Sequence, residues 1–432
     1  MPRVLLVSYA FPPVGGVGVQ RVLKWTKFLP EFGWDASVLT VSNPSVPILD
    51  PTLLEQVPSA TQIVRARTYE PGYAAKTAAP SQPGLAARIK SAIKTPAIAV
   101  AKKALQPDAQ ILWHPQARRA GRELLDRERH DVIVATAPPF SSLLLGRHLA
   151  RRSGLPLVVD YRDEWDLSNR HWENKRPGRV ALAVQRRMQD AALRQASLIL
   201  STSPGTAAEL RRRAAEAGIE RPSECVYNGY DPDDFPPLEQ QPREDFGHGT
   251  DRYRLTFAGT LWALNSIGPF ADGIDTLPQA TRDRLELLCV GRRLDDEERL
   301  LDRIAATGVA VSRVGFVEHG RAVELMRRSD GLLQQTVGGE GTHRVISAKT
   351  FEYIAAGRPI LLIAAEGDQS AVVRRVPHAE TVEPHDAAGI GRAIERLIAA
   401  RDAPRSEPPA DLHRREGTRQ LAEILRRVIE NA

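Results

Sequence analysis

Two charged residues in the second half of the chain are spaced so that both could bind one ligand. Lys349 and Glu352, in the stretch SAKTFEYIAAGRPILLI (Ser347–Ile363), are three positions apart and therefore share one face of a helix. That helix is expected to end at Gly357, before a buried strand that begins at Pro359. A carboxylate in a cleft can accept two hydrogen bonds from a ribose diol, and a neighbouring lysine can hold phosphate. Taken alone, however, the pair is better explained as a salt bridge on a solvated helix.

Two glycine-containing turns follow expected strands. In YAFPPVGGVGVQRVLKW the turn contains Gly16 and Gly18, and a helix is expected to begin near Val19. In FAGTLW the turn contains Gly259 and Thr260. Glycines at the carboxyl end of a strand let backbone N–H groups approach an anion, and the helix N-terminus adds a favourable field. Neither turn has the G-x-G-x-x-G spacing of dinucleotide sites, so flexible turns without a ligand are the alternative.

A charged cluster follows another expected strand, in VVDYRDEWD. It holds Asp160, Arg162, Asp163 and Glu164. Acids and an arginine at a strand's carboxyl end can form a catalytic site, but they can equally form an arginine–carboxylate network that orders a loop. The acidic turn Asp231–Asp234 suggests no metal, because a solvated turn needs no ion.

Short apolar runs rich in β-branched residues alternate with amphipathic segments along the whole chain. This alternation predicts parallel sheets that helices cover on both faces. The expected strands are Arg3–Tyr9, Ala36–Val41, Gln62–Arg67, Asp131–Ala137, Leu155–Tyr161, Ser197–Ser203, Glu224–Tyr230, Arg254–Thr260, Leu285–Gly291, Val309–Phe316, Gly331–Thr336, Pro359–Ala364 and Ala379–Pro384.

The pattern divides into two α/β domains, each doubly wound and Rossmann-like, with a cleft expected between them. Residues 1–235 form the first domain, and 236–252, rich in proline, glycine and charge, form a linker. Residues 253–403 form the second domain, and 404–432 add a C-terminal helix.

Composition excludes several classes of protein. The net charge of +6 is mild and lacks the basic runs interleaved with aromatics that are typical of nucleic-acid binders. Two distant cysteines, Cys225 and Cys289, suggest a reducing cytoplasm and no disulfide framework. No apolar run reaches the roughly 18 residues of a membrane span. The basic segment Gly84–Leu105 is either a helical insertion over the sheet, which we favour, or a helix that binds the inner membrane surface.

Several of these stretches together resemble glycosyltransferase family 4, whose members have the GT-B fold. SAKTFEYIAAGRPI is similar to that family's donor-site signature, Lys–x–x–Glu–Tyr–x–Ala–x–Gly–x–Pro. YAFPPVGGVGVQR, YNGYDPDDF and FAGTLW match in the same order, and TAPPFSSLLLG followed by LPLVVDYRDEW resembles one branch of the family. The matches span almost the whole chain.

The resemblance implies a retaining glycosyltransferase that needs no metal or other cofactor and uses a nucleotide sugar as co-substrate. The second domain would bind the donor, the first would bind the acceptor, and the C-terminal helix would cross back to the first. Glu352 would bind the ribose and Lys349 the phosphates. The other expected donor-site positions are Gly16, Gly18, Gly259, Thr260, Arg292, Gly315, Phe316, Val317 and Arg344. Catalytic candidates are Lys349 and, more weakly, Asp160, Arg162 and Asp163.

Two departures from the family pattern keep other functions open. The family often has a second Glu eight residues before the position of Glu352, where this chain has Arg344. Many members also have Arg and Lys after the glycine that corresponds to Gly259, and this chain has neither. Either Arg344, Lys349 or Arg292 would then supply the positive charge. The alternatives are a non-catalytic subunit that binds a sugar nucleotide or a membrane surface, and a sugar-nucleotide epimerase or hydrolase. The acceptor (a glycan, a lipid-linked molecule or a small natural product) is left open.

Overall fold

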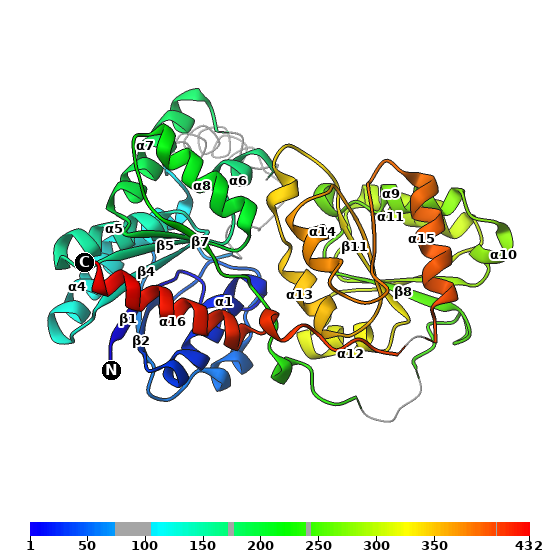
Figure 1. The fold of residues 1–432 in the computed structure, drawn as a ribbon, viewed down its shortest axis with the longest axis horizontal. Helices are drawn as coiled ribbons and strands as arrows, with labels where there is room; N and C mark the ends of the chain where they lie inside the picture. Colours follow the sequence, from blue (N-terminus) through cyan, green and yellow to red (C-terminus); the bar gives the residue numbers. More distant parts are fainter. Residues whose placement is uncertain (74–104, 172–176, 239–242, 403) are drawn as a thin grey trace, which may run out of the picture. The chain divides into compact units, whose positions relative to one another are not determined.

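Two parallel sheets organise the chain, and each belongs to its own compact unit (Figure 1). The computed structural model describes residues 1–73, 105–171, 177–238, 243–402 and 404–432. Unit 1 comprises Met1–Tyr227 and Gly417–Ala432, and unit 2 comprises Asn228–Glu416. The expected α/β class with two Rossmann-like domains is therefore confirmed. Of the expected basic segment Gly84–Leu105, all but its last residue lies outside the described residues.

Within the described part of unit 1, seven parallel strands form one sheet in the order β3-β2-β1-β4-β5-β6-β7. The strands are β1 (Arg3–Val7), β2 (Asp35–Val41), β3 (Gln62–Ala66), β4 (Val132–Ala137), β5 (Leu157–Tyr161), β6 (Leu198–Ser201) and β7 (Ser223–Cys225). The register aligns Leu6 of β1 with Val38 of β2 and with Val134 of β4. The order reverses at β1 and β4, which places the loops after these strands at a topological switch point.

Successive residues of these strands pack against opposite layers of helices. Leu5 and Val7 of β1 lie in the core that contains Trp113, whereas Val4 and Leu6 lie in the core that contains Trp25. This alternation follows from the two-residue period of a strand, and burial on both faces explains why the runs are continuously apolar.

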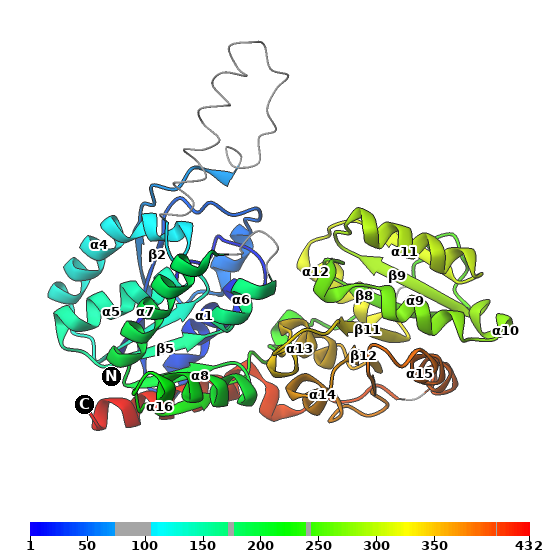
Figure 2. The same cartoon turned by 90° about the horizontal axis from the view of Figure 1, so that it is seen from above.

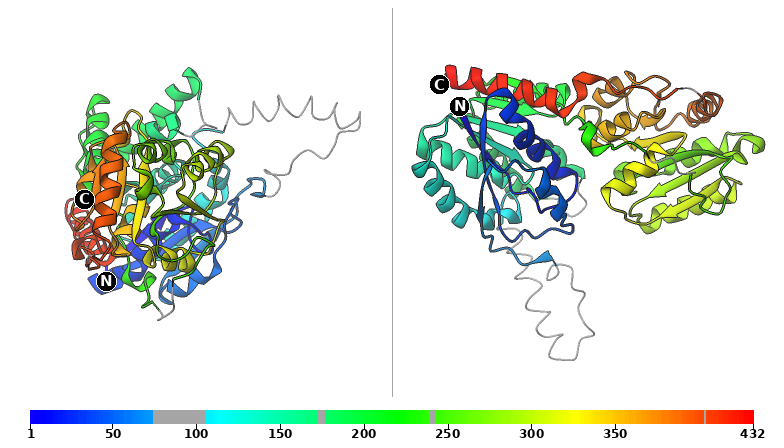
Figure 3. Two further views of the ribbon diagram at one scale, coloured as in Figure 1. Left: turned by 90° about the vertical axis from the view of Figure 1, so that its right-hand side faces the viewer. Right: turned by 90° about the horizontal axis from the view of Figure 1, so that it is seen from below.

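The helices of unit 1 cover both faces of its sheet. They are α1 (Val17–Phe28), α4 (His114–Arg127), α5 (Ser141–Ser153), α6 (Trp165–His171), α7 (Arg179–Gln195), α8 (Pro204–Glu216) and α16 (Arg414–Glu430). Helix α16 starts in unit 2, but from Gly417 onward it belongs to unit 1, where it lies beside α1 (Figures 1 and 3). Its Leu421 and Leu425 are fully buried in the same core as Val22 and Trp25 of α1. Apolar residues four positions apart give α16 the single buried stripe that docks it there.

Within the described part of unit 2, six parallel strands are ordered β10-β9-β8-β11-β12-β13. They are β8 (Tyr253–Ala258), β9 (Leu285–Val290), β10 (Ala310–Val314), β11 (Gly331–Thr336), β12 (Ile360–Ala364) and β13 (Glu380–Val382). The helices are α9 (Gly268–Asp275), α10 (Gln279–Arg282), α11 (Asp295–Ala306), α12 (His319–Arg327), α13 (Ala348–Ala355), α14 (Asp368–Val373) and α15 (Ala387–Ala399). Figure 2 shows α13 and α14 near β12. The switch point of this sheet lies between β8 and β11, and α13 follows β11 after a short 3-10 helix, Thr342–Arg344.

Some element boundaries differ from those expected. β7 covers only Ser223–Cys225, whereas a strand to Tyr230 was expected. Beyond Cys225 the chain leaves the sheet because the carbonyls of Val226 and Tyr227 accept hydrogen bonds from Arg21. The expected linker 236–252 is also held to unit 2, since Arg243 forms salt bridges with Asp330 (2.5 Å) and Glu286 (3.2 Å). Among the described residues, no helix has both the length and the apolarity to cross a bilayer.

Candidate active site

Helix α13 presents Lys349 and Glu352 because its other face is built into unit 2. Phe351 and Ile354 are buried, while Lys349 and Glu352 are only partly so. The hydroxyl of Tyr353 accepts a hydrogen bond of 2.8 Å from the backbone N–H of Ala258, the last residue of β8. One turn along, Thr350 accepts a bond of 2.9 Å from the side-chain amide of Gln334 in β11. These two buried bonds fix the helix against the carboxyl ends of β8 and β11.

The ammonium of Lys349 lies against the first turn of the β8 loop. A β-carbon added to Gly259 would lie 1.7 Å from Lys349 Nζ, and that nitrogen is 5.2 Å from the centre of the Phe257 ring. Burial lowers the pKa of Lys349 below its usual value, and the nearby carboxylate of Glu352 partly opposes this shift. No salt bridge or hydrogen bond of the Lys349 ammonium occurs among the described residues. A cation that is desolvated in this way is well suited to bind an anionic ligand.

The loops after β8, β9 and β10 are held in contact by backbone hydrogen bonds. Gly259 N–H donates to Val290 O (2.7 Å), and Gly291 N–H donates to Val314 O (3.0 Å) and Gly315 O (3.1 Å). Gly291 has a φ of 123°, and a β-carbon there would lie 2.2 Å from the carbonyl oxygen of Gly259. Only glycine fits this contact. The expected positions Gly259 and Gly315 therefore lie on adjoining loops at one edge of the sheet.

The remaining expected positions of unit 2 differ in how exposed they are. Thr260, Arg292 and Gly315 are exposed, Val317 is half-buried, and the ring of Phe316 is 60% exposed. Arg344 is half-buried in a short 3-10 helix that precedes α13. Sequence reasoning did not single out Arg293, which donates to Glu298 Oε1 (2.6 Å) and to the carbonyls of Gly291 and Val314. Its neighbour Arg292 makes no such contact in the described part of the chain.

In unit 1 the structure brings Gly18 and Arg162 together. The guanidinium of Arg162 donates to the carbonyls of Gly18, Ala137 and Pro138, and so joins the loops that follow β1, β4 and β5. Gly16 is the N-cap of α1, with a φ of 89°, and no side chain caps the helix. Gly16 and Gly18 are both exposed, and no atom of the described residues lies within 4 Å of where a β-carbon of Gly16 would be. The first N–H groups of α1 are therefore accessible to an anion.

Asp160 belongs to a buried network. Its carboxylate accepts hydrogen bonds from Arg21 Nη2 (2.9 Å) and Thr136 Oγ1 (2.7 Å), and the side chains of the ion pair are 2% and 0% exposed. The guanidinium of Arg21 also lies 4.6 Å from the centre of the Trp25 ring. This geometry favours the structural alternative for Asp160, an arginine–carboxylate network. Arg21 lies in the stretch YAFPPVGGVGVQRVLKW, but its distance in sequence from Asp160 does not predict that the two residues pair.

Two other acids of the VVDYRDEWD stretch, Asp163 and Glu164, have surroundings that differ from those of Asp160. Asp163 is exposed, whereas Glu164 is buried and accepts a hydrogen bond of 3.1 Å from Thr206 Oγ1. In the acidic turn, Asp231 accepts a hydrogen bond of 3.2 Å from the backbone N–H of Asp233, as a turn residue does. The described residues contain no group of three His, Cys, Asp or Glu side chains arranged to hold a metal ion.

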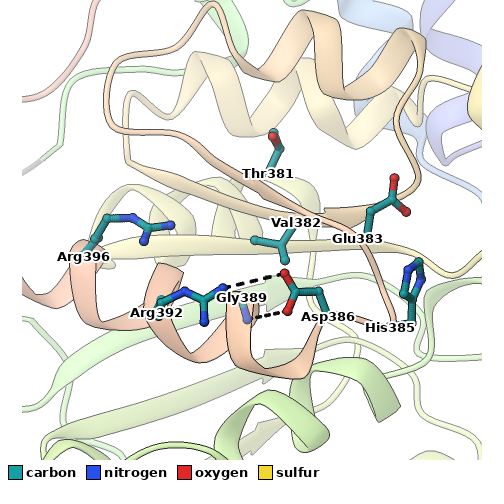
Figure 4. Close-up of a pocket in the computed structure, with 8 residues that line it drawn as sticks. All are labelled: Thr381, Val382, Glu383, His385, Asp386, Gly389, Arg392 and Arg396. Atoms are coloured by element: carbon teal, nitrogen blue, oxygen red, sulfur yellow. Dashed lines mark hydrogen bonds and ion pairs between the residues drawn. The ribbon is translucent and has the colours of Figure 1, made fainter.

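A cavity of about 690 Å³ lies elsewhere in unit 2, between the edge strand β13 and the start of α15 (Figure 4). Asp386 caps α15 there by accepting a hydrogen bond of 2.8 Å from Gly389 N–H, and it also pairs with Arg392. None of the expected donor-site residues lines this cavity.

Residues 15–219 match the family model described as "Glycosyl transferase 4-like domain". Most of unit 1 is therefore similar to a glycosyl transferase 4-like domain. The match covers the glycine turn of α1 and the Asp160–Arg162 segment and ends before unit 2. No curated protein matches the sequence.

Solved structures with the GT-B fold match the whole chain. A structure of Anabaena Alr3699/HepE in complex with UDP and glucose has 15% identity and a TM-score of 0.55, covering 100% of this chain and 98% of that one. An E. coli structure described as trehalose-6-phosphate bound with UDP-2-fluoro glucose has 11% identity and a TM-score of 0.61, over 100% and 96%. An α,α-trehalose-phosphate synthase (UDP-forming) from Burkholderia xenovorans has 12% identity and a TM-score of 0.58, over 99% and 96%. At these identities the likeness establishes the fold, which is GT-B.

Proposed function

We propose that this protein is a retaining glycosyltransferase that moves a sugar from a nucleotide sugar to a nucleophile, such as a hydroxyl, of an acceptor. The observation that carries the proposal is the desolvated ammonium of Lys349 against Gly259, one turn from Glu352, at the switch point of unit 2. A glycosyl transferase 4-like domain in unit 1 and the GT-B fold of the whole chain support it. The HepE structure contains UDP and glucose, which favours a UDP-sugar as the first donor to test.

Each site residue has a role in this proposal. The carboxylate of Glu352 accepts hydrogen bonds from the ribose hydroxyls, and Lys349 binds the diphosphate. The exposed backbone at Gly315 and Val317 borders the nucleobase, and Phe316 offers an aromatic surface beside it. Unit 1 binds the acceptor, and the open N-terminus of α1 at Gly16 and Gly18 contributes N–H donors for an anionic group.

The chemistry needs no carboxylate base in this scheme. The bond between the anomeric carbon and the diphosphate oxygen breaks, and the acceptor oxygen bonds to the same face of the sugar. An oxygen of the leaving diphosphate takes the acceptor proton. Charge grows on the diphosphate during this step, so Lys349 and backbone N–H groups stabilise the transition state. We propose that the reaction proceeds without a metal ion or other cofactor, and that Asp160 and Arg162 position loops instead of contacting the reacting atoms.

Thermal stabilisation by nucleotides tests the donor site. UDP, GDP, ADP and dTDP and their common sugars would be compared on the wild type, Glu352→Ala and the matched control Glu395→Ala, whose carboxylate is exposed on α15. A ligand at 100 times its Kd stabilises the native state by about 2.7 kcal/mol. We expect one nucleotide to act selectively, with its effect lost in Glu352→Ala and retained in Glu395→Ala. If none of the nucleotides stabilised the protein against heat, the result would favour a non-catalytic subunit.

An epimerase or hydrolase would share the nucleotide site but need no acceptor. Incubating the wild type with the stabilising nucleotide sugar alone separates these reactions. We expect the donor to persist without an acceptor, and rapid conversion to an epimer or to free sugar would replace the transferase proposal.

A basic surface on unit 1 supports contact with the cytoplasmic face of a membrane. Arg118 and Arg122 lie one turn apart on α4, and Arg147 and Arg151 lie one turn apart on the neighbouring α5. Burial and these four arginines lower the pKa of His148, and none of the four forms a salt bridge within the described residues. Clustered cations that form no salt bridge within the described part of the chain favour anionic lipid. We expect the wild type to sediment with phosphatidylglycerol vesicles but not phosphatidylcholine vesicles, and the Arg118→Gln/Arg122→Gln double variant to bind less.

A further inference from the structure

A second cavity lies in unit 1 at the amino ends of β6 and β7, which is the opposite edge of the sheet from the glycine turn. Its volume is about 560 Å³, within the range of small-molecule sites. The end of α7, the segment before β7 and the last turn of α16 enclose it. Its polar lining residues include Arg194, Ser197, Arg221, Glu224, Arg427 and Asn431.

Positive charge exceeds negative charge in this cavity. Three arginines face one acid, and Arg427 Nη2 already donates to both oxygens of Glu224, at 3.0 and 2.8 Å. Arg194 and Arg221 have no carboxylate partner among the described residues. Within the described part of the chain both donate to backbone carbonyls, Arg194 to Ala217 O (3.3 Å) and Arg221 to Glu220 O (2.8 Å) and Arg194 O (3.0 Å).

One donor of Arg221 has no acceptor among the described residues. Arg221 Nε is buried and forms no hydrogen bond to any residue that the structure describes. A buried N–H that lacks an acceptor destabilises the protein unless a ligand or water supplies one. Nη2 of Arg221 bonds to the end of α7 at Arg194 O, and Nη1 bonds to the neighbouring Glu220 O, so this structural role does not use Nε.

We propose that this cavity binds a phosphorylated sugar or polyol. Arg221 and Arg194 would hold the phosphate, because a guanidinium matches two phosphate oxygens at once. The side chains of Ser197 and Asn431 would bind the hydroxyls. The lining residues include no aromatic ring, so the cavity offers no surface on which a nucleobase could stack. The ligand is therefore a sugar phosphate and not a nucleotide, and the site is separate from the donor site of unit 2.

Ligand binding would also stabilise the last turn of α16. Arg427 and Asn431 line the cavity, and Asn431 Nδ2 donates to Arg427 O (2.8 Å). Val428 between them packs into the core of unit 1. A ligand held by this turn would therefore protect its amides from hydrogen exchange.

Calorimetric titration of the full chain tests the proposal, with glucose 6-phosphate, inorganic phosphate and glucose as probes at constant ionic strength. We expect glucose 6-phosphate to bind more tightly than phosphate and glucose not to bind. Arg221→Gln should weaken binding about tenfold or more, since it removes a charge-assisted pair of hydrogen bonds. The control Arg186→Gln changes an exposed arginine of α7 outside the cavity and should leave affinity unchanged. Glu352→Ala should also bind normally, which distinguishes this site from the donor site.

Hydrogen exchange of the wild type gives a second readout that does not depend on any variant. We expect glucose 6-phosphate to slow exchange at residues 427–431. The proposal is overturned by absence of saturable binding, by equal loss of affinity in Arg186→Gln and Arg221→Gln, or by binding without protection of these amides. In each of those cases the arginines serve only the helix ends.

Discussion

The ammonium nitrogen of Lys349 lies where Gly259 lacks a side chain, 1.7 Å from the position that a β-carbon would take. The two residues are far apart in sequence, and the contact depends on α13 being fixed to the end of β8 through Tyr353 and Ala258. It places the positive charge directly at a strand end, where ligands of open α/β sheets bind. The contact therefore links the conformation of one glycine to the position of the proposed phosphate-binding group.

Gly259→Ala should impair both stability and nucleotide binding. The φ of 140° at this residue strains any L side chain, at about 1–3 kcal/mol, and the new methyl group would displace Lys349. We expect a lower free energy of unfolding in denaturant titrations and a loss of nucleotide-induced stabilisation. Gly320→Ala is the matched control, because Gly320 lies on α12 with no atom near its β-carbon position. Wild-type nucleotide binding in Gly259→Ala would contradict the assignment of Lys349.

Nucleotide affinity should depend on alkaline pH through Lys349. Burial lowers its pKa, so the ammonium loses its proton at a lower pH than an exposed lysine does. Above that lowered pKa, affinity for the stabilising nucleoside diphosphate should fall by about tenfold per pH unit. Unliganded unit 2 should meanwhile gain stability as pH rises through that pKa, because burial penalises the charged form. Titrations at increasing pH check this, and Lys349→Arg, which stays charged, should lack the decline.

Tyr353→Phe should destabilise unit 2 without removing a ligand contact. It deletes the acceptor of the buried Ala258 N–H and should lower the free energy of unfolding by about 1–3 kcal/mol. Chemical denaturation measures this cost. The comparison is Tyr69→Phe, since Tyr69 is 56% exposed and its hydroxyl accepts a hydrogen bond from the half-buried side chain of Gln116. Equal effects in both variants would mean that the Tyr353 bond does not fix α13.

Asp160→Asn should lower the stability of unit 1. It removes the Asp160 counter-charge from the buried guanidinium of Arg21, at a cost of about 3–5 kcal/mol. Asp163→Asn, at an exposed position, should change stability by less than about 0.5 kcal/mol. Unfolding curves and nucleotide affinity would be measured for both. A catalytic Asp160 would instead show near-normal stability and a large loss of transferase turnover.

Local pattern was enough to predict most of the fold. Each run that was expected to be a strand overlaps a strand of the two sheets. The inner strands gave the clearest signal, because burial on both faces leaves an unbroken apolar run in the sequence. Boundaries were less certain where a distant residue intervenes. β7 ends at Cys225 because Arg21 of α1 donates hydrogen bonds to the carbonyls of the next two residues, Val226 and Tyr227.

For the candidate site, the sequence by itself determined which residues share a helical face or a strand end, as with Lys349 and Glu352. Three positions along a helix bring side chains together whatever the rest of the chain does. Only the tertiary structure decided the pairs Arg21–Asp160, Gly18–Arg162 and Gly259–Lys349. The first two pairs are separated by 139 and 144 residues, and no local period relates them. Such contacts depend on which strands become neighbours and on how closely their loops pack, so only the folded chain defines them.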